Sequence, residues 1–143
     1  MKLKRHPKRI VIAAVGLLIA IQFVPVDRTN PAVTGDIAAP PEVEQVLKIS
    51  CYDCHSHETR WPAYSFVAPV SWLIAHDVEE GREHLNFSQW QTLNASAQQH
   101  MKVEIWEEVE QGEMPLGIYV FVHSNAKLNP DQKQILQAWS QKK

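Results

Sequence analysis

The sequence predicts a small all-α domain preceded by a single N-terminal transmembrane helix. Two observations carry this prediction: apolar residues recur at helical spacing in several segments, and an uncharged run occupies residues 10–26. No segment alternates polar and apolar residues as a half-buried strand does. The 143 residues suit one compact domain and are too few for an enzyme with separate substrate and cofactor domains.

The charges are distributed unevenly along the chain. The formal net charge is −2, but residues 1–9 carry five basic side chains and no acid. Residues 10–143 therefore carry nine bases against sixteen acids, a net charge of −7. A body this acidic does not favour nucleic-acid backbones, so we expect no nucleic-acid partner. Hydrophobic residues make up 45% of the chain, which excludes a disordered or fibrous protein.

The uncharged run over residues 10–26 predicts a membrane anchor. As a helix, these seventeen residues span about 26 Å, just short of the about 30 Å of a hydrocarbon core. Because the basic residues 1–9 precede the run, the positive-inside rule predicts that they form a cytoplasmic tail. The chain after Asp27 then lies in the periplasm, outside a bacterial inner membrane.

This run has two other interpretations. A cleaved signal peptide has the same charge order, but no good small-x-small cleavage site follows the run, so a retained anchor is favoured. A buried core helix of a soluble protein is the third interpretation. The five flanking cations and the lack of a polar face argue against it.

The rest of the chain divides into a linker and a folded domain. Residues 27–40 are rich in proline and show no apolar period, which predicts a tether before a domain over residues 41–143. The domain begins with a helix over residues 41–50, because Pro41 suits a first turn and acidic residues follow at the positive end. Its apolar stripe consists of Val43, Val46, Leu47 and Ile49.

The middle of the domain alternates between loops and helices. Prolines interrupt residues 58–69, which predicts an ordered aromatic loop. Helical spacing resumes at Val70 and continues toward Gly81. Ser88 and Gln91 have the spacing of a capping box and predict another helix start.

Two helices complete the domain. The first has a face of Met101, Ile105, Trp106 and Val109 and ends near Gly112. The second starts at residues 129–132, Asn-Pro-Asp-Gln, which combine an N-cap, a proline at the first helical position and a glutamine three residues after the cap. Its buried side consists of Ile135, Leu136 and Trp139.

The only cysteines stand in one short motif, Cys51-Tyr52-Asp53-Cys54-His55. This CxxCH pattern is the attachment signature of c-type haem. Two thiols three residues apart on one turn can add to the two vinyl groups of a porphyrin, and the adjacent imidazole can then bind the iron. The motif therefore predicts one covalently attached haem c, with His55 as an axial ligand.

Three other uses of two cysteines fit less well. A structural disulfide across two intervening residues closes a tiny loop and stabilises little. A thioredoxin-like CxxC needs a βαβ setting, which the sequence lacks. A zinc site lacks its second pair of ligands.

A haem iron bound by His55 has a sixth coordination position. Met114 is the first candidate, because it follows the predicted helix end at Gly112 and can project from a loop. Met101 lies on a helical stripe and is better explained as core. His84 is the best histidine alternative, and an open or water-bound position is the third possibility. The further histidine candidates for this position are His76, His100 and His123.

Two long segments and one short segment resemble the bacterial haem-binding domain family, whose members are small, often membrane-anchored proteins with one CxxCH. The long segments are CYDCHSHETRWPAYS at 51–65 and APVSWLIAHDVEEGREHLNFSQW at 68–90, and the short segment is GEMP at 112–115. The likeness covers nearly all of residues 41–143. The segment NPDQKQILQAW at 129–139 is also similar to the closing helix of small class I cytochromes c.

The resemblance implies a cytochrome c-like domain built around one haem. By that likeness, Cys51 and Cys54 bind the haem covalently, His55 is the proximal iron ligand and Met114 the distal one. The tract between His55 and Met114 departs from the common cytochrome pattern.

Together these features predict a membrane-anchored periplasmic c-type cytochrome that carries single electrons between redox partners. No catalytic constellation is required, so we expect no enzyme activity and no small-molecule substrate. The acidic body predicts basic protein partners. The alternatives are a haem-based sensor or small-ligand binder, and an accessory to a haem peroxidase. A sixth ligand that stays bound to the iron favours electron transfer, whereas both alternatives require a sixth position that another ligand can occupy.

Overall fold

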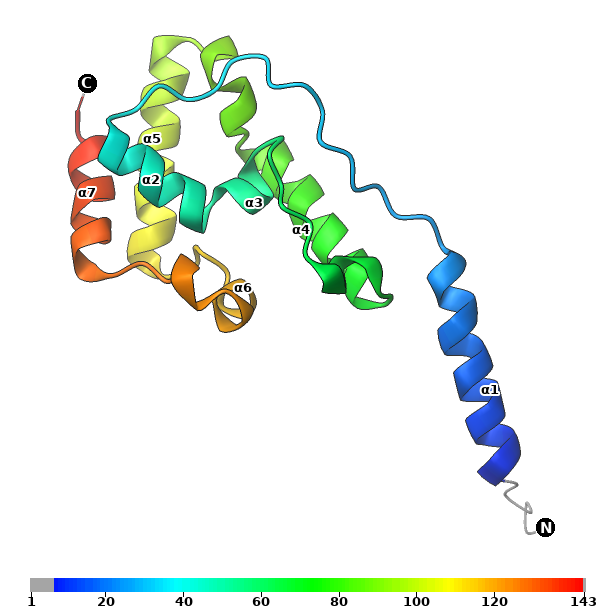
Figure 1. Cartoon of the computed structure of the whole chain (residues 1–143). Coiled ribbons are helices and arrows are strands. Elements are labelled where there is room, and N and C mark those ends of the chain that lie inside the picture. Colours follow the sequence, from blue (N-terminus) through cyan, green and yellow to red (C-terminus); the bar gives the residue numbers. More distant parts are fainter. Residues whose placement is uncertain (1–6, 143) are drawn as a thin grey trace. The chain divides into compact units, whose positions relative to one another are not determined.

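A computed structural model describes residues 7–142 of the chain (Figure 1). These residues form helices joined by loops, and none of them belongs to a strand. The predicted all-α class is therefore confirmed. The chain divides into two compact units, each of which is described separately below.

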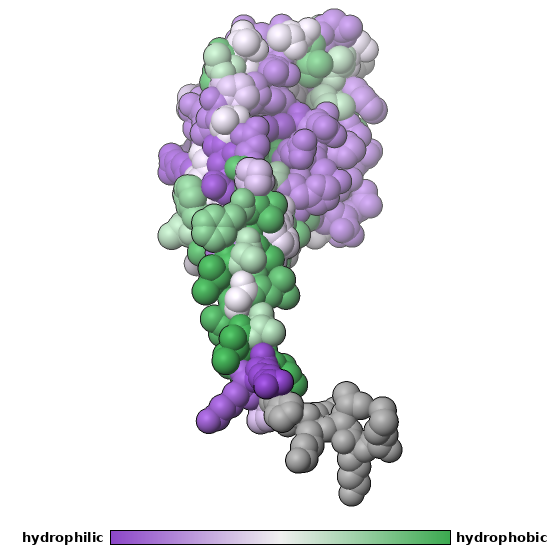
Figure 2. Space-filling model, turned by 90° about the vertical axis from the view of Figure 1, so that its right-hand side faces the viewer, coloured by the Kyte–Doolittle hydropathy of each residue, from purple (hydrophilic) through white to green (hydrophobic). Residues whose placement is uncertain are grey.

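The first unit contains the described residues through Thr29 together with Trp61–Asp77. Its elements are α1 (Pro7–Ala20), η1 (Ile21–Phe23), η2 (Ala63–Phe66) and the first part of α4 (Val70–His84). No side chain of α1 is buried, and Figure 2 shows a hydrophobic surface along this helix.

The N-terminal helix is shorter than the run that predicted it. The backbone becomes extended at Val24, because proline disfavours the helical conformation in the residue before it and Pro25 follows. Within residues 7–142, no helix is both long enough and apolar enough to cross a membrane. The predicted transmembrane helix over residues 10–26 is thus not found.

The second unit contains Asn30–Arg60 and the chain from Val78 onward. Its helices, besides the end of α4, are α2 (Pro41–Ser50), α3 (Tyr52–His55), η3 (Phe87–Thr92), α5 (Ala95–Gln111), α6 (Gly117–Val122), η4 (Ser124–Ala126) and α7 (Pro130–Ser140). Helix α7 packs against both α2 and α5.

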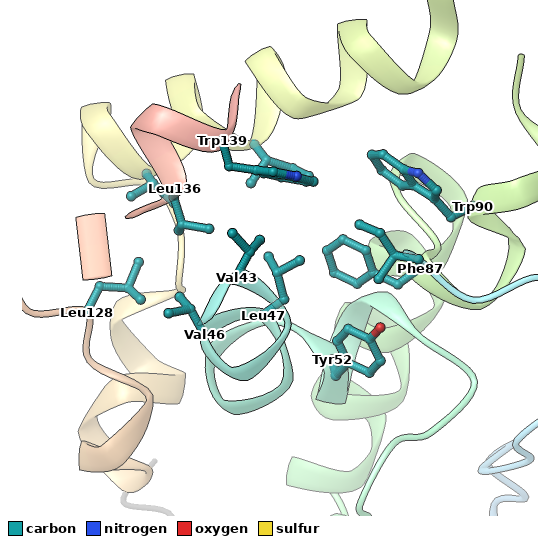
Figure 3. Close-up of a cluster of buried hydrophobic side chains, with 12 residues drawn as sticks. Val43, Val46, Leu47, Tyr52, Phe87, Trp90, Leu128, Leu136 and Trp139 are labelled. Carbon is teal, nitrogen blue, oxygen red and sulfur yellow. The ribbon is translucent and has the colours of Figure 1, made fainter. Parts of the chain in front are cut away.

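The core of the second unit forms where these helices meet (Figure 3). The stripe predicted for α2 is buried at Val43, Val46 and Leu47, while Ile49 is half-buried. Helix α7 adds Leu136 and Trp139. An aromatic stack continues the core toward the cysteine motif: the Tyr52 and Phe87 ring centroids lie 5.0 Å apart, and those of Phe87 and Trp90 lie 6.2 Å apart.

Local sequence signals set most of the helix ends in this unit. Asn129 caps α7 with the predicted capping box, in which Gln132 is the reciprocal partner. Helix α5 ends at Gly112, whose φ of 81° places it in the left-handed region that favours glycine. Asn94 caps the start of α5 by accepting a hydrogen bond from the Ala97 N–H at 2.9 Å.

The capping box predicted at Ser88 is wrong. The cap of η3 is Asn86, whose side chain accepts a hydrogen bond from the Ser88 N–H. The Ser88 hydroxyl is instead engaged by the backbone N–H of His57 at 2.9 Å. A contact across 31 residues thus replaces the local cap.

Part of the predicted tether belongs to the folded unit. The N–H groups of Thr34 and Gly35 both donate to the Ser88 carbonyl oxygen at 3.0 Å, and the Gln91 N–H donates to Gly35 at the same distance. Ile37 is buried in the core. Residues 34–37 are therefore fixed on the second unit, although they form no helix, as expected for a proline-rich segment.

Candidate functional site

The cysteine motif forms a single closed turn between α2 and α4. Helix α2 ends at Ser50, and Cys51 caps both α2 and the one-turn helix α3. The Cys51 carbonyl oxygen accepts hydrogen bonds from the N–H groups of Cys54 and His55, at 3.2 and 2.9 Å. This turn presents two thiols and one imidazole from five consecutive residues.

Neither cysteine forms a disulfide, and both are half-buried. Burial raises the pKa of the Cys51 thiol to about 12, and the neighbouring Cys54 adds to the shift. Cys51 is therefore protonated at neutral pH.

The imidazole of His55 is held in one orientation by the end of α4. Its Nδ1 lies 2.8 Å from the carbonyl oxygen of Gly81 and 3.2 Å from that of Leu85. Because carbonyl oxygens only accept, Nδ1 carries the proton and donates it, which leaves a lone pair on Nε2. Burial lowers the pKa of His55, so the ring is neutral at pH 7. A neutral imidazole whose second nitrogen bonds a carbonyl is the usual form of a metal-binding histidine.

The close approach of α4 to the motif requires glycine at position 81. A Cβ atom placed there would lie 2.9 Å from the Cys54 carbonyl oxygen and 3.3 Å from the Cys54 Cβ. The nearest obstacle is backbone, which cannot rotate away as a side chain can. The same glycine supplies the shorter of the two hydrogen bonds to His55.

We expect the substitution Gly81→Ala to destabilise the protein by about 1–3 kcal/mol, the usual cost of forcing extra atoms into a packed site. The added methyl must push α4 away from Cys54 and weaken the hydrogen bond to His55. Urea unfolding of the full-length, haem-loaded protein measures the change. The matched control is Gly117→Ala, since a Cβ at Gly117 meets nothing within 4 Å. Equal stability of the two variants would contradict this account of Gly81.

Both residues between the cysteines tie the motif to distant segments. The Tyr52 hydroxyl donates to the Asp36 carboxylate at 2.8 Å. The Asp53 carboxylate accepts from the Arg60 N–H at 3.1 Å and from the Tyr119 hydroxyl of α6 at 2.8 Å. These hydrogen bonds connect the turn to the segment before α2, to the loop that follows the motif and to α6.

A second set of polar contacts fixes the chain that follows the motif. Arg82 donates from Nε to the Ser56 carbonyl oxygen at 2.8 Å and from Nη2 to the side chains of Asn30 and Thr59, at 2.8 and 2.9 Å. The buried ring of His57 uses both nitrogens, Nδ1 with the Ala32 carbonyl at 3.0 Å and Nε2 with the Asn86 amide at 2.8 Å. His57 is therefore a structural residue with no nitrogen left to bind iron.

Met114 lies on the loop between α5 and α6, after the predicted helix end at Gly112. The N–H groups of Glu113 and Met114 both donate to the Glu108 carbonyl oxygen, at 3.0 and 3.2 Å. These bonds close the end of α5 after Gly112, and the Met114 side chain is half-buried beside the core. Its assignment as the distal iron ligand stays a prediction.

His84 occupies a different position. It is the exposed last residue of α4, in the turn whose carbonyl oxygens hold His55. It is close enough for its charge to lower the pKa of His55. The role of His84 as the alternative distal ligand stays a prediction. Of the other histidines, His76 and His100 are exposed, and the His123 ring lies 4.3 Å from that of Tyr119.

The fold and the motif together define a class of protein. A small helical domain that presents two thiols beside an imidazole with a lone pair on Nε2 has the donor set that attaches a porphyrin and binds its iron. Comparison with family models agrees: the model described as a haem-binding domain matches residues 16–142. The chain belongs to the haem-binding domain family, and haem is its cofactor. No curated protein and no solved structure matches it.

Proposed function

We propose that this protein is a c-type cytochrome that carries single electrons between redox partners. Cys51 and Cys54 would each hold the haem through a thioether, and His55 Nε2 and the Met114 thioether would bind its iron. One observation carries the proposal. The His55 ring is oriented by hydrogen bonds from Nδ1 to the carbonyl oxygens of Gly81 and Leu85, and it lies on the same turn as both thiols. The bound haem would supply an iron that gains and loses one electron.

The surrounding residues support a carrier more than a catalyst. The bonds of Asp53, Arg82 and Gly81 fix the motif on several sides, and a rigid ligand frame keeps the geometry change between two oxidation states small. A carrier needs no acid–base group and no substrate pocket, so we propose no enzyme activity and no small-molecule substrate.

The proposed partners are basic redox proteins. Exposed carboxylates concentrate on the second half of α5, just after its end and on the exposed face of α4, and a surface of one sign steers oppositely charged proteins toward it. These side chains are Glu79, Glu80, Glu83, Glu104, Glu107, Glu108, Glu110 and Glu113. Transient, salt-sensitive association is the behaviour expected of an electron carrier.

We also propose that the N-terminal segment attaches the protein to a bacterial inner membrane, with the haem domain in the periplasm. Three features support it: the basic residues before α1, the exposed apolar side chains along α1, and the absence of acids before Asp27. Covalent haem attachment in bacteria takes place on the periplasmic side, which agrees with this orientation.

A spectroelectrochemical titration tests the electron carrier directly. The full-length protein is titrated between its ferric and ferrous forms under nitrogen and again under carbon monoxide. We expect one single-electron transition at the same midpoint potential under both gases, because a bound Met114 leaves carbon monoxide no position on the iron. A positive shift of the midpoint under carbon monoxide would contradict the proposal and indicate a sensor or ligand-binding protein instead.

A further inference from the structure

The first unit carries a second exposed apolar surface, separate in sequence from α1. Five large apolar side chains are exposed between the last residue of η2 and the first turn of α4. They are Phe66, Val67, Val70, Trp72 and Leu73, and the exposed fractions of Phe66 and Val67 are 58% and 55%. We call these five residues the apolar loop surface. Large apolar side chains that are exposed together mark sites of contact with a membrane or another protein.

Hydrogen bonds join this loop to the end of the N-terminal helix. The Gln22 side chain of η1 donates to the Ala68 carbonyl oxygen at 3.1 Å and accepts from the Ala68 N–H at 2.9 Å. The Arg28 guanidinium donates to the Ser65 carbonyl oxygen at 3.3 Å and stacks 4.6 Å over the Phe66 ring. The apolar loop surface therefore begins where the apolar surface of α1 and η1 ends, at Phe23, whose exposed fraction is 81%.

The charges of the first unit differ from those of the second. Residues 59–76 contain no acid, and neither do residues 1–26. Of the sixteen acids in the chain, only Asp27 and Asp77 belong to the first unit, and both stand at its boundaries. Acids are repelled by the phosphates of lipid headgroups, whereas arginine and tryptophan are favoured at that depth. Arg28 lies beside the apolar loop surface, and Trp72 is one of its five residues.

We propose that the apolar loop surface enters the headgroup region of the lipid bilayer beside the end of the N-terminal helix. This inference rests on the membrane attachment proposed above and adds a second contact with the same membrane. A protein partner would also bury apolar side chains, but the lack of acids and the continuity with α1 favour lipid. The bonds of Gln22 and Arg28 then fix the loop at a set depth.

Photo-crosslinking in the native membrane tests this contact. A genetically encoded benzophenone amino acid replaces Phe66 in one full-length variant and Trp72 in another. Val15, an exposed residue in the middle of α1, reports on the proposed anchor. Phe121 of α6 is the matched control, because it is an apolar residue with an exposed fraction of 87% in the second unit. Irradiated cells are analysed by mass spectrometry for adducts at each position.

We expect a mass increase of one phospholipid at positions 66, 72 and 15, and none at position 121. A lipid adduct at position 15 without one at 66 or 72 overturns the loop contact and leaves the membrane attachment intact. Protein adducts at positions 66 and 72 overturn it in favour of a docked protein. No lipid adduct at any position overturns the membrane attachment together with the loop contact.

Discussion

We expect that replacing Cys51 and Cys54 together by serine abolishes the covalent haem attachment proposed above. A serine hydroxyl is far less nucleophilic than a thiol and does not add to a porphyrin vinyl group. The chain is expressed with haem-maturation machinery and separated on a denaturing gel, where covalent haem is detected by its peroxidase stain at the mass of the protein. We expect full staining of the parent protein and none of the double variant.

The single variants Cys51→Ser and Cys54→Ser are the matched controls. Each keeps one thiol in the same turn, and one thioether is enough to hold haem to the chain through denaturation. Both are therefore expected to stain. Haem that stays with the double variant on the denaturing gel would refute attachment through these cysteines, while leaving membership of the haem-binding domain family unaffected.

The second large effect is expected from Met114→Ala. Ferric haem with a methionine ligand shows a weak absorption band in the red from sulfur-to-iron charge transfer, and this band should disappear in the variant. The opened position should then bind carbon monoxide in the ferrous state, whereas we expect no carbon monoxide binding by the parent protein. Absorption spectra of both oxidation states, with and without carbon monoxide, measure the two effects.

Two control variants locate the ligand. Met101→Ala removes a half-buried methionine that packs against the core, and His84→Ala removes the histidine beside His55. Both should keep the red band. An unchanged spectrum of Met114→Ala would disprove the assignment, and a change confined to His84→Ala would transfer the role of distal ligand to that histidine.

The features predicted correctly from sequence are those that depend on neighbours within a few residues. Asn129 and Gln132 form their capping box within one turn, and Gly112 ends α5 through its own backbone conformation. The apolar stripe of α2 is buried as predicted, because helical spacing alone brings Val43, Val46 and Leu47 to one face. The cysteine motif is also local, which is why haem binding could be predicted from five consecutive residues.

The features that sequence reasoning missed depend on contacts between distant segments. Ser88 was predicted as a cap, but its hydroxyl is engaged by His57, 31 residues earlier. Helix α6 was not predicted, since Gly-Ile-Tyr-Val-Phe-Val is rich in β-branched and aromatic residues that favour strands. Its Tyr119 bonds Asp53 across 66 residues, and no local pattern signals that pair.

The N-terminal helix shows how one residue limits a prediction from hydropathy. The uncharged run continues to Val26, and a count of apolar residues therefore extends the helix that far. The helical backbone stops before Val24, because Pro25 restricts the residue that precedes it. The presence of Pro25 was the available signal for an earlier end.

The support of His55 has a consequence for how this site tolerates mutation. Its two hydrogen-bond acceptors are main-chain carbonyl oxygens of Gly81 and Leu85, and every amino acid carries one. No substitution at position 85 can delete the acceptor, and one at position 81 acts only by displacing α4. Tyr119 and Arg82, by contrast, act through side chains that a single codon change removes. Single substitutions can therefore remove the side-chain contacts around the motif more easily than they can remove the hydrogen bonds that orient the His55 imidazole.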